Sequence, residues 1–186
     1  MHQKEIYRLV LTGLFTALAV ALAYALAAFP NIELMTAVVF LAGYTLGPSS
    51  GAMVGGIAMF VYSGFNPYGP AAPPLFFTQI LGMTIAGLSG GVLGVHGGKS
   101  ALRTPNKAVL GAAGFFLTLA YDLLTTVGTT ITVGWSTAQF FAVLALSYLI
   151  PVHIFSNTLI FAVLIPACLK TIEQSGVMHR FQQLEN

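Results

Sequence analysis

Five polar or ionisable residues lie within or beside long apolar stretches of the sequence: Glu33, Gln79, Asp122, His153 and Asn157. A carboxylate inside an apolar span is costly unless it faces a cavity or a partner group, so Asp122 is a candidate for ligand or ion binding. His153 and Asn157 are four residues apart, which places them on one face of a helix. The alternatives are a hydrogen-bond network around Asp122 with a purely structural role, and a packing role for His153.

The sequence carries no recognisable catalytic motif. It has no His-Glu-x-x-His zinc motif, no Gly-x-Ser-x-Gly elbow and no Gly-x-x-x-x-Gly-Lys-Ser/Thr phosphate loop. Cys168 is the single cysteine, which excludes a disulfide framework and a cysteine-based zinc site. We therefore expect neither an enzyme nor a bound metal or cofactor, and this chain cannot hydrolyse ATP by itself.

Composition predicts the elements that position these residues. Of the 186 residues, 56% are hydrophobic and only 6% are charged, whereas a soluble domain has about 25% charged residues. The chain is therefore expected to be an integral membrane protein in a lipid bilayer, with no role in nucleic-acid binding. Runs such as Leu9 to Phe29 do not alternate between apolar and polar residues, which favours helices over a membrane barrel.

The apolar segments predict a single domain over residues 1–186 with six transmembrane helices. The expected spans are Ile6–Phe29, Leu34–Leu46, Gly51–Phe65, Leu75–Val95, Ala108–Val133 and one crossing within Phe140–Leu169. The second and third spans are short for a bilayer of about 30 Å. The break between them, from Gly47 to Gly51, contains a proline and two glycines, which are residues typical of a tight turn.

The distribution of cations predicts the orientation. With six crossings, every Lys and Arg falls on one side: Lys4, Arg8, Lys99, Arg103, Lys107, Lys170 and Arg180. The positive-inside rule then places both termini in the cytoplasm, in the cytoplasmic membrane. The expected external loops, Pro30–Glu33, Asn66–Pro74 and Gly134–Gln139, contain no Lys or Arg. A cleaved signal peptide is the alternative interpretation of the first span.

Small residues recur at every fourth position on three predicted helices, and such rows let helix backbones approach closely in lipid. We expect internal packing for the rows on the third and fourth helices, which are Gly47, Gly51, Gly55 and Gly82, Ala86, Gly90, Gly94. The first helix has two rows, Gly13, Ala17, Ala21, Ala25 and Ala19, Ala23, Ala27. Two packing faces on one helix suggest that one of them belongs to another protein.

The loop Asn66–Pro74 contains four prolines. A merely flexible connector would not need such stiffness, so the loop is interpreted as a shaped lid or pocket wall, with a simple connection as the alternative. Aromatic residues near the expected outer side would suit any flat ring system: Tyr62, Tyr68, Tyr121 and Trp135. They do not identify a ligand.

Taken together, these motifs resemble the S-components of energy-coupling factor vitamin transporters, which are substrate-binding membrane subunits. The resemblance covers nearly the whole chain and includes an Ala-x-x-x-Ala motif at Ala17 and Ala21 and a Leu-Gly-Pro-x-x-Gly turn at Leu46–Gly51. The segments Asn31–Leu34 and Phe65–Pro70 look most like the branch that includes cobalamin-type S-components.

The resemblance implies a high-affinity vitamin binder that docks on a transmembrane coupling subunit and two ATPase subunits. It places the ligand site near the outer face, at Glu33, Asn66, Tyr68, Gln79, Tyr121, Asp122, Trp135, His153 and Asn157. It assigns the contact with the coupling subunit to Gly13, Ala17, Ala21 and Ala25. Two other functions remain open, a stand-alone channel or facilitator for a small solute and a membrane enzyme acting on an isoprenoid or lipid.

Overall fold

The computed structural model describes residues 3–96, 105–147 and 149–175. Over these residues the chain forms helices and no strand, which confirms the all-α prediction. The helices are α1 (Gln3–Ala25), α2 (Met35–Leu46), α3 (Pro48–Gly64), α4 (Pro73–His96), α5 (Lys107–Val133), α6 (Thr137–Leu146) and α7 (Ile150–Gln174).

Four of these helices, α1, α4, α5 and α7, are long and apolar enough to cross a membrane. The other two predicted spans correspond to α2, with 12 residues, and α3, with 17 residues. Six crossings with cytoplasmic termini therefore stay a prediction. Three of the cations behind it, Lys99, Arg103 and Arg180, lie outside the described residues.

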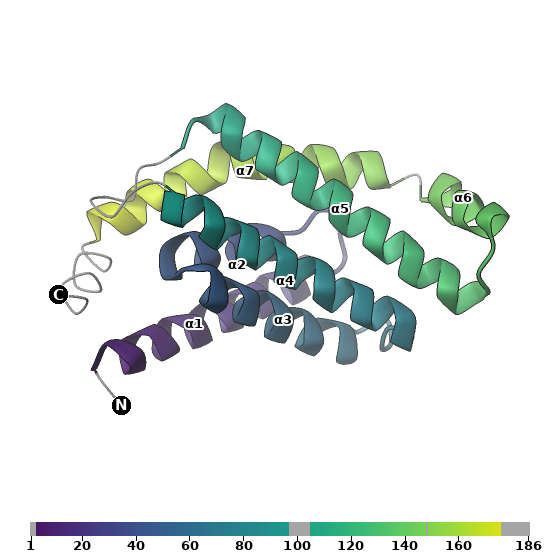
Figure 1. Cartoon of the computed structure of the whole chain (residues 1–186), viewed down its shortest axis with the longest axis horizontal. Helices are drawn as coiled ribbons and strands as arrows, with labels where there is room; N and C mark the ends of the chain where they lie inside the picture. The colour runs from purple at the N-terminus through teal and green to yellow at the C-terminus, as the bar shows by residue number, and fades with distance from the viewer. Residues whose placement is uncertain (1–2, 97–104, 148, 176–186) are drawn as a thin grey trace.

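The long helices run roughly along the longest axis of the molecule, and α2 lies among them (Figure 1). All twelve residues of α2 are buried. One of its sides contributes to an apolar cluster with α1, α3 and α4, and the other contributes to a cluster with α5 and α7. The ring of Phe40 on α2, for example, lies 5.0 Å from the ring of Phe161 on α7, centroid to centroid.

Glycines bring the backbones of α2, α3 and α4 into direct contact. A Cβ atom added at Gly87 of α4 would lie 2.0 Å from the carbonyl oxygen of Gly51 on α3, and one added at Gly90 would lie 2.1 Å from the carbonyl oxygen of Phe40. No residue other than glycine fits at such separations. The internal-packing role predicted for the small-residue rows of α3 and α4 is therefore confirmed.

The two small-residue rows of α1 face in different directions. Ala19 and Ala23 are buried against the bundle. Members of the other row are exposed, namely Gly13, Ala17, Ala21 and Ala25. At its first turns α1 is held by Arg8, whose Nε donates to Ser50 Oγ at 2.7 Å and whose Nη2 donates to Ser49 Oγ at 3.0 Å.

Two predicted boundaries are wrong. The break at Gly47–Gly51 is only one residue long, because α3 begins at Pro48, whose fixed φ and missing N–H suit the first turn of a helix. Gly47, with φ of 95°, makes the turn alone.

The segment Phe140–Leu169, within which one crossing is predicted, contains most of α6, which ends at Leu146, and the start of the long apolar helix α7, which runs from Ile150 to Gln174. Pro151 lies in the first turn of α7, where its missing N–H costs no hydrogen bond within the helix. The predicted external loop Gly134–Gln139 is also too long. Thr137 already starts α6, because Ser136 caps this helix by accepting a hydrogen bond from the N–H of Gln139 at 3.1 Å.

Candidate functional site

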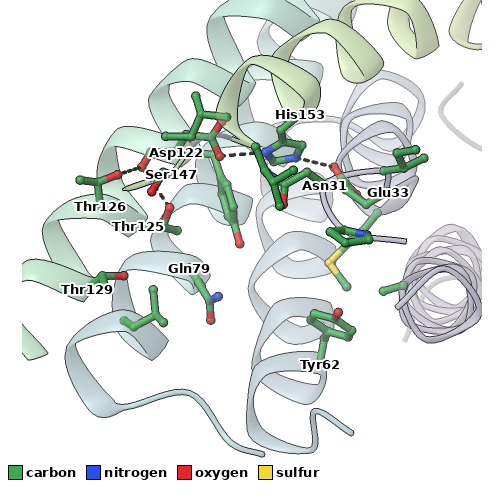
Figure 2. Close-up of a pocket in the computed structure, with 18 of the residues that line it drawn as sticks. Asn31, Glu33, Tyr62, Gln79, Asp122, Thr125, Thr126, Thr129, Ser147 and His153 are labelled. Atoms are coloured by element: carbon green, nitrogen blue, oxygen red, sulfur yellow. Dashed lines mark hydrogen bonds and ion pairs between the residues drawn. The ribbon is translucent and has the colours of Figure 1, made fainter. Parts of the chain in front are cut away.

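A cavity of ≈ 520 Å³ lies at the end of the bundle where α1 finishes and α2 begins. The ends of α3 and α6, the beginnings of α4 and α7, and the second half of α5 complete its wall. Its body is apolar and aromatic, with Met59, Met83, Tyr62, Tyr68 and Tyr121 among the lining residues. Polar side chains from several elements point toward this space (Figure 2).

The connection between α1 and α2 carries Glu33 to the cavity. Asn31 adopts a left-handed backbone conformation, with φ of 58°, which asparagine tolerates better than most residues. Its carbonyl oxygen accepts a hydrogen bond from Ser156 Oγ at 3.0 Å, which ties this connection to α7. The helix α2 begins at Met35, shortly after Glu33. The position of Glu33 is therefore restrained on one side by the bond from Ser156 to Asn31 and on the other by α2.

His153 on α7 lies between two carboxylates that come from different parts of the chain (Figure 2). Its Nδ1 is 2.8 Å from Asp122 Oδ1 on α5, and its Nε2 is 3.7 Å from Glu33 Oε1. Only 6% of the surface of Asp122 and of His153 is exposed. In such a low-dielectric place an imidazolium between two carboxylates is held strongly by both.

Glu33 has further partners, which hold the N-terminus of α2. Its Oε2 accepts a hydrogen bond from the backbone N–H of Thr36 at 2.9 Å, and its Oε1 accepts one from Asn157 Nδ2 at 3.0 Å. Burial raises the pKa of the Glu33 carboxyl, but His153 and the hydrogen bonds from Thr36 more than offset this effect. The pKa of Glu33 therefore lies below its usual value, and the carboxylate is charged at neutral pH.

Asp122 has fewer partners than Glu33. Its Oδ2 is buried and has no hydrogen-bond partner among the described residues, and the same holds for His153 Nε2 and Asn157 Oδ1. Leaving a buried charged oxygen without a partner is unfavourable. Because Asp122 and His153 line the cavity, these two residues have bonding capacity left for a molecule that enters it.

Several hydroxyl groups in the cavity wall donate to backbone carbonyls. Thr125 and Thr126 donate to the carbonyl oxygen of Asp122, at 3.0 and 2.7 Å. Ser147 donates to Val143 at 2.8 Å, and Tyr68 donates to Ala27 at 3.3 Å. Each hydroxyl proton is therefore engaged inside the protein, and the oxygen lone pairs remain as acceptors.

Gln79 differs from these hydroxyls. Its Oε1 accepts a hydrogen bond from Ser63 Oγ at 2.7 Å, so its amide nitrogen is left as a donor. The cavity therefore offers many acceptors and at least one donor. This arrangement can hold an organic molecule by hydrogen bonds at several points while the aromatic and Met side chains cover its apolar part.

Most of the residues expected at the ligand site come together in this cavity. Six of them line it: Glu33, Tyr68, Gln79, Tyr121, Asp122 and His153. Asn157 lies behind the wall, with none of its surface exposed, and supports Glu33 while donating to Thr118 Oγ1 at 3.0 Å.

Asn66 and Trp135 do not line the cavity. Asn66 shapes the loop after α3, because its Oδ1 accepts from the N–H of Tyr68 at 2.9 Å, and Trp135 is 62% exposed in the link between α5 and α6. Sequence reasoning passed over the threonines of α5 that line the cavity, Thr125, Thr126 and Thr129. A signal was present for Thr126, because polar residues follow each other at every fourth position around Asp122: Thr118, Asp122, Thr126 and Thr130.

Comparison with known proteins identifies a family. The family model described as "ECF transporter, substrate-specific component" matches residues 7–177, which is nearly the whole chain. No curated protein and no solved structure gives a significant match.

Proposed function

The chain belongs to the family of ECF transporter substrate-specific components, and on this premise we propose that its cavity binds a vitamin or related micronutrient for import. Such components are transport subunits and not enzymes, and each works with an energy-coupling module made of a transmembrane subunit and ATPases. The chain is accordingly a multi-pass membrane protein. Two ATPase subunits would supply the hydrolysis of ATP that this chain lacks.

The observation that carries the proposal is the cavity with its buried polar cluster. Its volume of ≈ 520 Å³ lies within the range of about 300–1,000 Å³ that is usual for small-molecule sites. Asp122 and His153 reach it from two different helices, and both have an atom without a partner. A preformed site of this kind loses little entropy when it binds a ligand, which favours high affinity.

Cobalamin and its precursors come first among the ligands to be tested, because the outer loops resemble those of the cobalamin-type branch. Size favours those precursors that do not contain the corrin macrocycle. Complete cobalamin is a large macrocycle with an attached nucleotide, whereas a cavity of ≈ 520 Å³ suits a molecule with one compact ring system.

We place residues 1–186 as one substrate-binding domain in the cytoplasmic membrane, with both termini inside and the cavity toward the outer face. The described cations support this orientation. Arg8 and Lys107 lie near the starts of α1 and α5, and Lys170 lies near the end of α7, whereas the cavity is built at the opposite ends of these helices. Cytoplasmic cations are what the positive-inside rule requires.

The exposed row of α1 is the proposed contact with the coupling subunit: Gly13, Ala17, Ala21 and Ala25. A Cβ atom added at Gly13 would have no neighbour within 4 Å, so this face has room for another backbone. Small residues are what close packing of two membrane helices needs.

The first experiment asks whether the protein works in a complex. We expect the tagged chain, co-expressed with an energy-coupling module, to co-purify with the transmembrane coupling subunit and the ATPases. Purification of the chain alone, combined with solute flux in liposomes that hold no ATPase, would instead support a channel or facilitator.

The second experiment tests the ligand site. Native mass spectrometry of the purified chain should detect a carried-over ligand, and titration calorimetry with a vitamin panel should confirm it. Asp122→Ala is expected to weaken binding by about 1–3 kcal/mol, because a buried polar group of the ligand loses its partner. Glu173→Ala, which changes an exposed carboxylate at the far end of α7, is the matched control and should leave the affinity unchanged. If Asp122→Ala and Glu173→Ala bind the ligand with equal affinity, Asp122 does not contribute to ligand binding.

A further inference from the structure

The charges around the cavity do not balance. Two carboxylates, Glu33 and Asp122, belong to its wall, and His153 is the single basic residue among the described lining residues. By formal count the two acids can bring two negative charges, and His153 can bring at most one positive charge. A net charge buried away from water is costly unless an opposite charge pairs with it.

The two carboxylates differ in how much bonding capacity they have left. Glu33 is engaged by Thr36, Asn157 and His153, and these contacts also hold the start of α2. Asp122 is engaged through Oδ1 only, by His153, and its Oδ2 is buried without a partner. Asp122 is therefore the carboxylate that is free to bind an incoming group.

Four of the seven hydroxyl groups among the described lining residues give an independent indication. Thr125, Thr126, Ser147 and Tyr68 all donate their protons to backbone carbonyls, so they offer lone pairs to the cavity. An acceptor-rich wall is complementary to a ligand group that carries several N–H bonds. The aromatic residues of the wall are compatible with the same ligand, because the face of a tyrosine ring attracts a cation.

We propose that the ligand carried by this protein contains a positive charge, as a protonated amine or a cationic nitrogen heterocycle, and that Asp122 pairs with that charge. The inference rests on the proposed function, since it narrows the class of micronutrient that the same cavity takes. The cationic group would lie beside Asp122 Oδ2 and the threonine oxygens of α5. The apolar remainder would lie against Met59, Met83 and the tyrosines.

Titration calorimetry on the full chain in lipid nanodiscs tests this charge selectivity. The probes are vitamins of three charge classes: cationic thiamine and pyridoxamine, neutral pyridoxine and riboflavin, and anionic biotin and pantothenate. Pyridoxamine and pyridoxine form a matched pair, because they differ by an ammonium group in place of a hydroxyl group. The panel is run on the wild-type chain, on Asp122→Asn and on Glu173→Gln, with thermal denaturation to verify that each variant is folded.

We expect the tightest ligand in the panel to be a cation. Asp122→Asn, which keeps the size of the side chain and removes its charge, should weaken that ligand by about tenfold or more, because charge-assisted hydrogen bonds are the strong ones. Glu173→Gln should not change the affinity. If the tightest ligand is neutral or anionic, the inference about charge is overturned while the function as a binding subunit stands.

Two other results would also overturn the inference. If a cation binds the wild type and a folded Asp122→Asn equally well, the charge is not recognised by Asp122. If the wild type binds none of these vitamins and also neither cobalamin nor its precursors, the proposed function falls and the inference falls with it. If the variant does not fold, the wild-type panel still tests whether the ligand is a cation.

Discussion

Helices α1 and α4 both carry glycine and alanine at every fourth position, yet the two rows have opposite surroundings. On α4, Gly90 and Gly94 lie so close to α2 that an added Cβ would be 2.1 and 2.3 Å from the carbonyl oxygens of Phe40 and Tyr44. On α1, the row from Gly13 to Ala25 is exposed, and an added Cβ at Gly13 would meet nothing within 4 Å.

The comparison teaches how far such a pattern can be interpreted. A row of small residues predicts that another backbone approaches closely, but it does not say whether that backbone belongs to the same chain. For α4 the partner is α2, inside the bundle. For α1 the buried row, with Ala19 and Ala23, already packs against the bundle, and the exposed row is the one that we propose for the contact with the coupling subunit.

Among variants that test the contrast between the two rows, Gly90→Val on α4 should cause the largest loss of stability. The added carbons would collide with the backbone of α2, so overpacking should lower the free energy of unfolding by about 1–3 kcal/mol or more. Thermal denaturation of the purified protein measures the change. The matched control is Gly13→Val on α1, for which we expect a nearly unchanged melting temperature. Similar losses in both variants would contradict the contrast between the rows.

The next effect concerns assembly and not folding. Ala21→Trp or Ala17→Trp should weaken association with the coupling subunit by about tenfold or more, because a large side chain keeps the two backbones apart. Ligand affinity and melting temperature of the isolated chain should stay the same, since both alanines are exposed. Pull-down with the coupling subunit gives the readout. If ligand binding and folding are lost together, the exposed row serves internal packing after all.

A smaller effect is expected where α1 is attached to the turn between α2 and α3. Arg8→Met keeps much of the side-chain length but removes the hydrogen bonds to Ser49 and Ser50. Because these bonds are partly exposed, we expect a loss of about 1 kcal/mol in the free energy of unfolding. Chemical denaturation would detect it, with Lys107→Met as the control for a lost cation. No difference between the two variants would show that Arg8 makes no measurable contribution to the attachment of α1.

The helix boundaries that the sequence predicts best are those with a clear chemical cause. The span Leu34–Leu46 corresponds to α2, and Ala108–Val133 corresponds to α5, because an apolar run between polar or glycine residues has few alternatives. The division into α6 and α7 was missed, since Phe140–Leu169 is predominantly apolar and hydropathy does not resolve a short break. The cap at Ser136 and the proline at 151 were the local signals.

The site was predicted in part for a similar reason. Asp122 and His153 are conspicuous because ionisable residues are rare in apolar segments. Their direct contact, and the approach of Glu33 to His153, join residues that are far apart in sequence, and no pattern along one segment encodes such a pairing. Trp135 was selected as an aromatic residue near the expected outer side and from the family resemblance. The structure leaves it exposed outside the cavity.

The burial of α2 has a consequence for how the protein is made. With 12 residues, α2 is about 18 Å long, which is short for a hydrocarbon layer of about 30 Å. During synthesis it should therefore leave the insertion machinery together with α3, as a hairpin closed at Gly47. The side of α2 that carries Phe40 is buried only after α7 has been synthesised and Phe161 packs against Phe40. Until α7 has been made, the nascent chain exposes the surface of α2 that α7 later covers, and quality-control proteases of the membrane could act on that state.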